Sequence, residues 1–178
     1  MRKSSLRTDA GESPDHQDDA GLRQAIELLF FAYRDFTGEA DALLADTGFG
    51  RAHHRVVYFV GANPGITVTE LLKILKITKQ SLSRVLGQLI EEDFIDQRTD
   101  EIDRRRRRMY LTIKGAELER RLTERQSLRI EKAYQGVGPA GVEGFRAVLR
   151  GIINKEDRGT VCASEKPGRF SENDGKKT

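Results

Sequence analysis

The sequence predicts a mainly α-helical protein with one small β-hairpin. Over most of the chain, apolar residues recur at steps of three and four, which is the spacing of amphipathic helices. Residues 94–111 instead have the composition of two short strands joined by a polar turn. No apolar run is long enough to cross a membrane, and the chain does not open with the apolar core of a secretion signal. We therefore expect one helical domain without a membrane span.

The 178 residues are enough for one domain with its own core, which we place at residues 20–155. Residues 1–19 and 156–178 contain few large apolar side chains, so we expect disordered tails there. The cations near the first residue would suit an arm on nucleic acid, but the aspartates that follow favour a solvated tail. A single cysteine, Cys162, excludes an intrachain disulfide and fits a reducing, cytoplasmic location.

The first two helices are expected at residues 20–45 and 51–61. The first has a broad, aromatic apolar stripe, which needs a partner to cover it. The stripe consists of Leu22, Ile26, Leu29, Phe30, Tyr33 and Phe36. Glycines within residues 48–50 end this helix, and an Asn-Pro-Gly turn at residues 63–65 ends the second one.

Two short helices joined by a tight turn come next. Thr67 and Glu70 have the spacing of a capping box, so a helix should begin at Val68. Thr78 can then cap a second helix, and one face of that helix is apolar and should meet the core. The apolar residues are Leu82, Val85, Leu86, Leu89 and Ile90. The opposite face has hydrogen-bonding groups, one cation and one residue without a side chain, and the major groove of DNA accepts such a surface. Its residues are Gln80, Arg84, Gly87 and Gln88. Two short helices of this kind indicate a helix-turn-helix.

A hairpin is expected directly after these helices. Its strands are residues 94–98 and 109–111, and residues 99–103 form the turn. Five consecutive arginines, Arg104 to Arg108, lie between the turn and the returning strand. Alone, this run could equally be a solvated block of charge. Following a helix-turn-helix, it indicates a wing that reaches the DNA backbone or minor groove.

Residues 67–112 therefore predict one DNA-binding surface. The candidate contacts are Thr78, Lys79, Gln80, Ser81, Ser83, Arg84 and Gln88 in the second helix and Asp103, Arg104, Arg105, Arg106 and Arg107 in the wing. The helix residues could instead form an ordinary exposed face, and Asp103 could be an ordinary turn residue. Serine and glutamine tolerate several bases, so the sequence does not define the DNA site.

Two more helices are expected after the wing, one from Thr112 to about Gln135 and a last one at residues 139–155. Together with residues 20–62, they exceed what a winged helix needs, and their apolar stripes must be buried somewhere. A two-fold homodimer built from residues 20–62 and 113–155 would bury them. It would place two recognition helices about one DNA turn apart, roughly 34 Å, and would require a palindromic operator.

The wing also contains a longer pattern. Asp103-Arg104-Arg105 is followed by Leu111-Thr112 and then by Lys114-Gly115. This resembles the wing of the MarR-type winged helix-turn-helix regulators, whose pattern is Asp-x-Arg, a short strand, and Leu-Thr-x-x-Gly. Residues 30–36, 50–55 and 76–82 are similar to the narrower PetP- and LdtR-like branch of that family. The resemblance covers about residues 22–155.

The resemblance implies a dimeric, DNA-binding transcription regulator whose matching helices interlock between two chains. It implies that Asp103 holds the wing arginine, Arg105, in position. It also implies that small amphiphilic effectors bind between the dimer helices and the winged helix. The effector-binding residues carried over would be Phe30, Tyr33, Phe36, His53, His54 and Val57.

Two residues depart from the family pattern. Asp93 stands where glycine is usual after the recognition helix, so we expect it to adopt a positive φ. Arg108 stands where an apolar strand residue is usual, which would weaken the packing of the wing or enlarge its basic patch.

Other functional classes receive little support. His53 and His54 could suggest a metal site or a hydrolase, but zinc needs three or four converging ligands. Only His16 and Cys162, both in predicted tails, could add to them. No nucleophile–base pair, phosphate-binding loop or carboxylate pair accompanies the histidines, so we expect no enzyme, no metal and no cofactor. The remaining alternative is a winged helix used for protein contact, which the basic wing disfavours.

Overall fold

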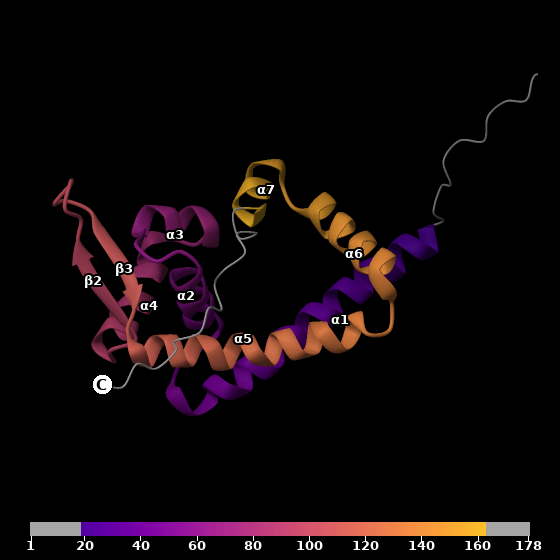
Figure 1. Cartoon of the computed structure of the whole chain (residues 1–178), viewed down its shortest axis with the longest axis horizontal. Helices are drawn as coiled ribbons and strands as arrows, with labels where there is room; N and C mark the ends of the chain where they lie inside the picture. The colour runs from indigo at the N-terminus through magenta and orange to yellow at the C-terminus, as the bar shows by residue number, and fades with distance from the viewer. Residues whose placement is uncertain (1–18, 163–178) are drawn as a thin grey trace, which may run out of the picture. The chain divides into compact units, whose positions relative to one another are not determined.

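The computed structural model describes residues 19–162, so most of the tails predicted at residues 1–19 and 156–178 lies outside it. Its helices are α1 (Asp19–Leu44), α2 (Arg51–Ala62), α3 (Val68–Leu75), α4 (Lys79–Glu91), α5 (Ile113–Tyr134), α6 (Gly138–Ile152) and α7 (Lys155–Cys162). Its strands are β1 (Ile66–Thr67), β2 (Ile95–Thr99) and β3 (Arg107–Leu111), and a 3₁₀ turn, η1 (Ala45–Thr47), follows α1 (Figure 1). The predicted class, mainly α with a small hairpin, is confirmed.

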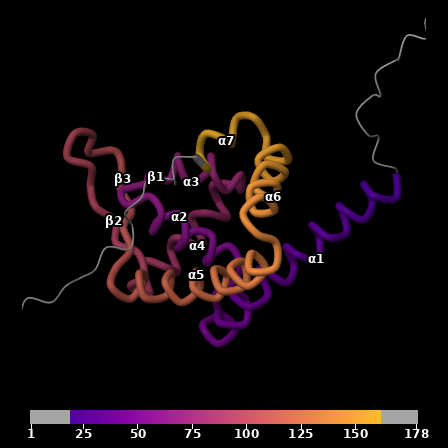
Figure 2. The backbone as a smooth tube through the Cα atoms, turned by 45° about the vertical axis from the view of Figure 1, so that its right-hand side comes forward, coloured from indigo at the N-terminus to yellow at the C-terminus, as the bar shows by residue number. Residues whose placement is uncertain are grey.

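The chain divides after Phe36 into two compact units. The first contains the beginning of α1, and the second contains the rest of the described chain. The hydrophobic core belongs to the second unit, where α2 packs against α4, α5 and β3 (Figure 2). The large side chains that are fully buried there are Leu44, Val56, Val57, Val60, Leu71, Leu82, Leu89, Ile95, Met109 and Leu122.

The caps predicted from the sequence are present. Thr67 Oγ1 accepts the backbone N–H of Glu70 at 3.3 Å, and Glu70 Oε2 accepts the backbone N–H of Thr67 at 2.8 Å. These bonds complete the capping box that begins α3. Thr78 caps α4 by accepting the N–H of Ser81 at 3.1 Å, and Thr112 caps α5 by accepting that of Gly115 at 3.0 Å. The positions of α3, α4 and α5 therefore follow from local sequence.

Asp93 ends α4 with a positive φ of 62°, as its place in the sequence predicted. The backbone N–H of Asp93 donates to Ile90 O at 3.1 Å, and that of Phe94 donates to Leu89 O at 2.8 Å. These two bonds form a Schellman motif, which needs a left-handed residue at this point. The chain then turns directly into β2.

The sheet has one strand more than the sequence predicted. Its order is β1-β3-β2 and both pairs are antiparallel. Ile66 lies opposite Met109, and Ile95 lies opposite Leu111. With only two residues, β1 is too short to show an alternating pattern. Its pairing connects the wing to the segment that precedes α3.

The disordered tail predicted from residue 156 is wrong for residues 156–162, which belong to α7. Arg158 donates from Nε to Ile153 O and from Nη2 to Gly151 O, both at 3.0 Å, and so holds α7 to the end of α6. Asp157 Oδ2 lies 2.7 Å from Lys76 Nζ at the end of α3, and this hydrogen bond raises the pKa of Lys76. These polar contacts replace the apolar stripe by which a helix is normally predicted. No helix in the described part is both long and apolar enough to span a membrane.

Candidate nucleic-acid interface

The predicted recognition helix, α4, separates its two faces clearly. Leu82, Val85, Leu86 and Leu89 are buried in the core. The predicted contact residues are all exposed: Thr78, Lys79, Gln80, Ser81, Ser83, Arg84 and Gln88. Gly87 is also exposed, and a Cβ added there would meet nothing within 4 Å. The outer face of α4 is therefore polar, with one position where another surface could approach the backbone closely.

Three of these seven residues already have partners within the protein. The hydroxyl of Thr78 lies 2.9 Å from Ser81 Oγ and accepts the N–H of Ser81, so both residues serve the cap of α4. Gln88 Oε1 lies 2.7 Å from His53 Nε2. The side chains of Lys79, Gln80, Ser83 and Arg84 have no hydrogen bond or ion pair within residues 19–162. These four remain available to a ligand.

The turn of the wing is organised by Asp100, a residue that the sequence pattern did not predict to have a role. Asp100 is only 4% exposed. Its Oδ1 accepts the backbone N–H of Ile102 at 2.8 Å and that of Asp103 at 2.9 Å. Its own N–H donates to Arg106 O at 3.1 Å. A buried carboxylate thus fixes the backbone of a loop whose side chains lie in solvent.

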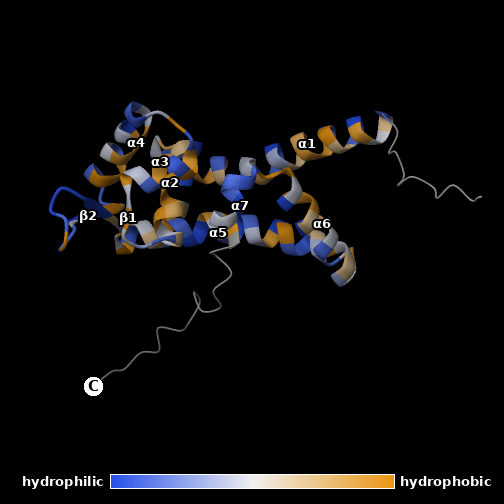
Figure 3. Ribbon diagram, turned by 90° about the horizontal axis from the view of Figure 1, so that it is seen from above, coloured by the Kyte–Doolittle hydropathy of each residue, from blue (hydrophilic) through white to orange (hydrophobic). Residues whose placement is uncertain are grey.

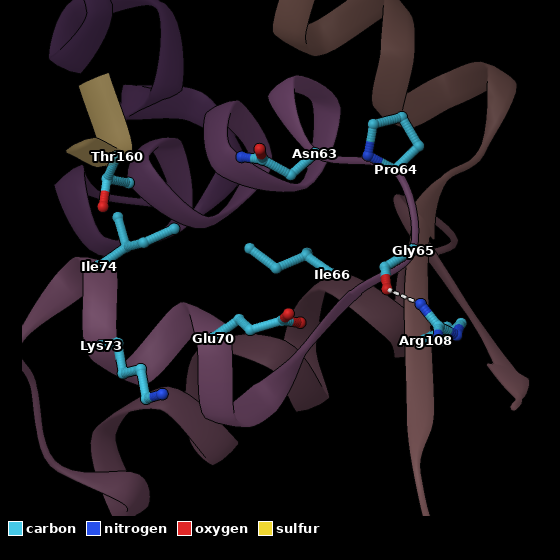
Figure 4. Close-up of a pocket in the computed structure, with 9 residues that line it drawn as sticks. All are labelled: Asn63, Pro64, Gly65, Ile66, Glu70, Lys73, Ile74, Arg108 and Thr160. Atoms are coloured by element: carbon cyan, nitrogen blue, oxygen red, sulfur yellow. Dashed lines mark hydrogen bonds between the residues drawn. The ribbon is translucent and has the colours of Figure 1, made fainter. Parts of the chain in front are cut away.

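Arg108 completes this arrangement. Its Nε donates to Asp100 Oδ2, and its Nη1 donates to Gly65 O at 3.3 Å (Figure 4). The two backbone N–H donors and then Arg108 lower the pKa of Asp100 from 3.8 to about 2. The expectation that Arg108 weakens the strand or enlarges the basic patch is wrong. Arg108 is half-buried and ties β3 to the start of β1.

Asp103 acts on the backbone of Arg105. Its Oδ1 accepts the Arg105 N–H at 3.0 Å, and its carbonyl accepts the Arg106 N–H at 2.8 Å. The expectation that Asp103 holds Arg105 could be met by a contact between the carboxylate and the Arg105 guanidinium, but the hydrogen bond in this structure is to the Arg105 main chain. Asp103 therefore positions Arg105 through the main chain.

The tip of the wing presents cations to solvent. Arg104, Arg105 and Arg106 are exposed, and their guanidinium groups make no hydrogen bond or ion pair in the described part of the chain. Arg107 differs, because its Nη1 donates to Thr99 Oγ1 on β2. Ile102, at the same tip, is 96% exposed. Figure 3 shows the hydrophilic hairpin projecting beyond the helices of its unit.

The residues suggested for effector binding fall into two groups. On α2, His53, His54 and Val57 are buried. His53 stacks on Phe49 with ring centroids 4.6 Å apart, and burial lowers the pKa of His54, although nearby Asp41 opposes the shift. On α1, the side chains of Phe30 and Tyr33 are largely exposed, and Phe36 is half-buried.

A cavity of about 380 Å³ lies elsewhere in the second unit (Figure 4). It is lined by Asn63, Pro64, Gly65, Ile66, Glu70, Lys73, Ile74, Arg108 and Thr160. Two of its polar groups serve the fold: Glu70 caps α3 and Arg108 holds Asp100. Among residues 19–162, no cluster of histidine, cysteine and acidic side chains has the arrangement of a metal site.

The sequence of the chain is similar to that of a known transcription regulator. It is 47% identical over 136 residues to the HTH-type transcriptional regulator PetP of Rhodobacter capsulatus, covering 76% of this chain and 82% of the relative. The model of the MarR family matches residues 47–106, from the end of η1 to the wing. The chain belongs to the MarR family. The MarR family and this relative are transcription regulators and not enzymes, so this chain is a MarR-family transcriptional regulator.

Solved structures of the MarR family share the fold. FabT of Streptococcus pneumoniae, in complex with DNA, superposes with a TM-score of 0.66 at 19% identity, covering 74% of this chain and 94% of that chain. The regulator MepR of Staphylococcus aureus gives a TM-score of 0.54 at 21% identity, covering 69% and 92%. At these identities the likeness establishes the winged-helix architecture.

Proposed function

We propose that this protein is a homodimeric repressor or activator that binds a palindromic operator through α4 and the wing, and that a small amphiphilic effector adjusts this binding. One observation supports DNA binding most strongly. Three exposed arginines, Arg104 to Arg106, stand on a loop whose backbone is fixed by the buried carboxylate of Asp100. Guanidinium groups of this kind suit phosphates and the minor groove.

The four uncommitted residues of α4 support the same conclusion. Lys79, Gln80, Ser83 and Arg84 are exposed on the face opposite the core. Major-groove readers use such hydrogen-bonding groups, and the wing then meets the backbone or the adjacent minor groove. The relative FabT was solved as a complex with DNA, which is consistent with this use of the fold.

Exposed apolar surface supports a dimer. Along the part of α1 that precedes Phe36, Leu22, Ile26, Phe30 and Tyr33 are each at least half exposed. On α6, Phe145, Val148 and Ile152 are between 43% and 62% exposed. Apolar stripes of this extent normally mark an interface, and a second copy of the chain offers the same stripes. Sedimentation should therefore show a dimer, and a stable monomer at micromolar concentration would exclude it.

The proposed effector would act on buried residues of α2. His53, His54 and Val57 are buried, so a ligand that reaches them must displace existing contacts. One such contact is the hydrogen bond between His53 and Gln88 on the recognition helix. Binding energy spent there would shift the protein between DNA-binding and non-binding arrangements. Substituting His53 by Ala should blunt the response of a bound operator to such a ligand.

The experiment that tests DNA binding is to sequence genomic DNA retained by the purified protein. A palindromic motif with half-sites about one helical turn apart is expected. The alternative, a winged helix used for protein contact, predicts random fragments without enrichment. It also predicts that any DNA binding lacks a steep dependence on salt.

A further inference from the structure

The contact between His53 and Gln88 joins a buried residue of α2 to the outer face of the recognition helix. Such a contact constrains which hydrogen-bonding groups the helix can offer to DNA. His53 is only 9% exposed, and its ring stacks on Phe49 with an interplanar angle of 14°. The imidazole is therefore held in one plane, with its two nitrogens directed at fixed partners.

The two partners determine the tautomer of His53. The backbone N–H of Gly50 donates to Nδ1 across 3.1 Å, which is also the capping bond at the start of α2. A backbone amide nitrogen can only donate, so Nδ1 carries no proton. In a neutral imidazole the proton then lies on Nε2. Nε2 must therefore donate to its neighbour, Gln88 Oε1, 2.7 Å away.

This bond in turn fixes the amide of Gln88. Its oxygen accepts from His53, so its NH₂ group, with two N–H donors, is the end left for another molecule. Gln88 is exposed and lies one helical turn after Arg84, on the same face of α4. A free glutamine can turn its amide either way and bind adenine through one donor and one acceptor. The fixed amide presents donors only.

We propose that His53 is a positioning residue that makes Gln88 a donor-only reader of the major groove, selecting guanine over adenine at one position of each operator half-site. Guanine presents two acceptors there, N7 and O6, which suit two N–H donors. Adenine presents an acceptor beside a donor, and its N6–H₂ would face the NH₂ of Gln88. The expected preference is roughly tenfold. This inference rests on the proposed function, because it requires α4 to lie in the groove.

The test is selection from an operator library randomised at each position, with parent and variant proteins compared by sequencing. His53→Phe keeps a ring against Phe49 but cannot donate, so the ratio of guanine to adenine at one position should fall about tenfold. Gln88→Ala should lose the preference at that same position. Tyr58→Phe is the matched control, because it changes another ring of α2, one that is exposed and packs on Phe59, and its selected sequence should equal that of the parent.

A second variant keeps the proposal testable if His53→Phe does not fold. Gln88→Glu still accepts from His53 but has no N–H donor. Its preference should move from guanine to cytosine, whose N4–H₂ donates in the major groove. Two results would overturn the inference. One is an unchanged guanine-to-adenine ratio in a folded His53→Phe protein. The other is a Gln88→Glu protein that still selects guanine at that position. If the parent itself selects no sequence, the proposed function fails instead.

Discussion

Gly115 explains the glycine of the Leu-Thr-x-x-Gly pattern, and substituting it tests how tightly the wing joins α5. A Cβ at this position would lie 2.0 Å from Phe94 O and 3.0 Å from Phe94 C. An ordinary carbon–oxygen contact is about 3.3 Å, so the groups must separate by about 1.3 Å. The obstacle is backbone, which cannot rotate away as a long side chain can.

That separation would strain bonds that define the end of α4. Phe94 O accepts the N–H of Thr112 at 3.1 Å, and Phe94 N–H donates to Leu89 O at 2.8 Å. Steric strain in a packed site costs about 1–3 kcal/mol, and a lost hydrogen bond costs about 1 kcal/mol. Helix propensity returns about 1 kcal/mol when alanine replaces glycine. The net prediction for Gly115→Ala is a loss of roughly 1–3 kcal/mol in the free energy of unfolding.

The matched control is Gly87→Ala in α4. A Cβ there meets nothing within 4 Å, so alanine should stabilise the protein by roughly 0.5–1 kcal/mol. Both variants are compared with the parent by urea denaturation, followed by circular dichroism at one protein concentration. A Gly115→Ala protein as stable as the parent would refute the reasoning, as would equal losses in the two variants.

Three further predictions concern α4 and the wing. Gly87→Ala should weaken operator binding several-fold despite its greater stability, because the added methyl group lies on the surface proposed to face DNA. Unchanged operator affinity would show that Gly87 does not contact DNA. Asp93→Gly should raise the free energy of unfolding by roughly 0.5–1 kcal/mol, since glycine adopts the positive φ without strain, and denaturation with urea checks the sign. The pKa of Asp100 falls from 3.8 to about 2, so its stabilisation of the wing is complete above about pH 4 and is lost as pH falls towards 2. The amide hydrogens of Ile102 and Asp103, which donate to Asp100, should lose their protection from exchange with solvent over the same pH range. In Asp100→Asn this loss of protection should no longer depend on pH.

The sequence predicted the features that depend on neighbouring residues. Thr67, Thr78 and Thr112 cap the helices they were expected to cap, because a cap involves residues only three apart. The left-handed Asp93 also follows from its position at a helix end. Hydrophobic periodicity then placed the buried face of α4 correctly.

The missed features depend on residues distant in the chain. Arg108 meets Gly65 across 43 positions, His53 meets Gln88 across 35, and Lys76 meets Asp157 across 81. No local pattern reveals such pairs. Asp100 could have been found, because an aspartate before a polar turn often accepts nearby backbone N–H groups. Its burial, however, comes from the approach of β3.

We expect the fixed, basic wing and α4 to bind DNA together. Fluorescence anisotropy with the selected operator, over a series of salt concentrations, tests it most directly. Arg105→Ala should reduce affinity by about 1–3 kcal/mol, and Asp103→Ala should reproduce part of that loss although it removes a negative charge. Arg107→Ala should cost less, because that guanidinium already binds Thr99. Arg125→Ala, an exposed cation of α5, should leave affinity unchanged. Two results would contradict this expectation: tighter operator binding by Asp103→Ala, or equal losses of operator affinity in the Arg105 and Arg125 variants. Either result would mean that the wing contributes only unspecific positive charge.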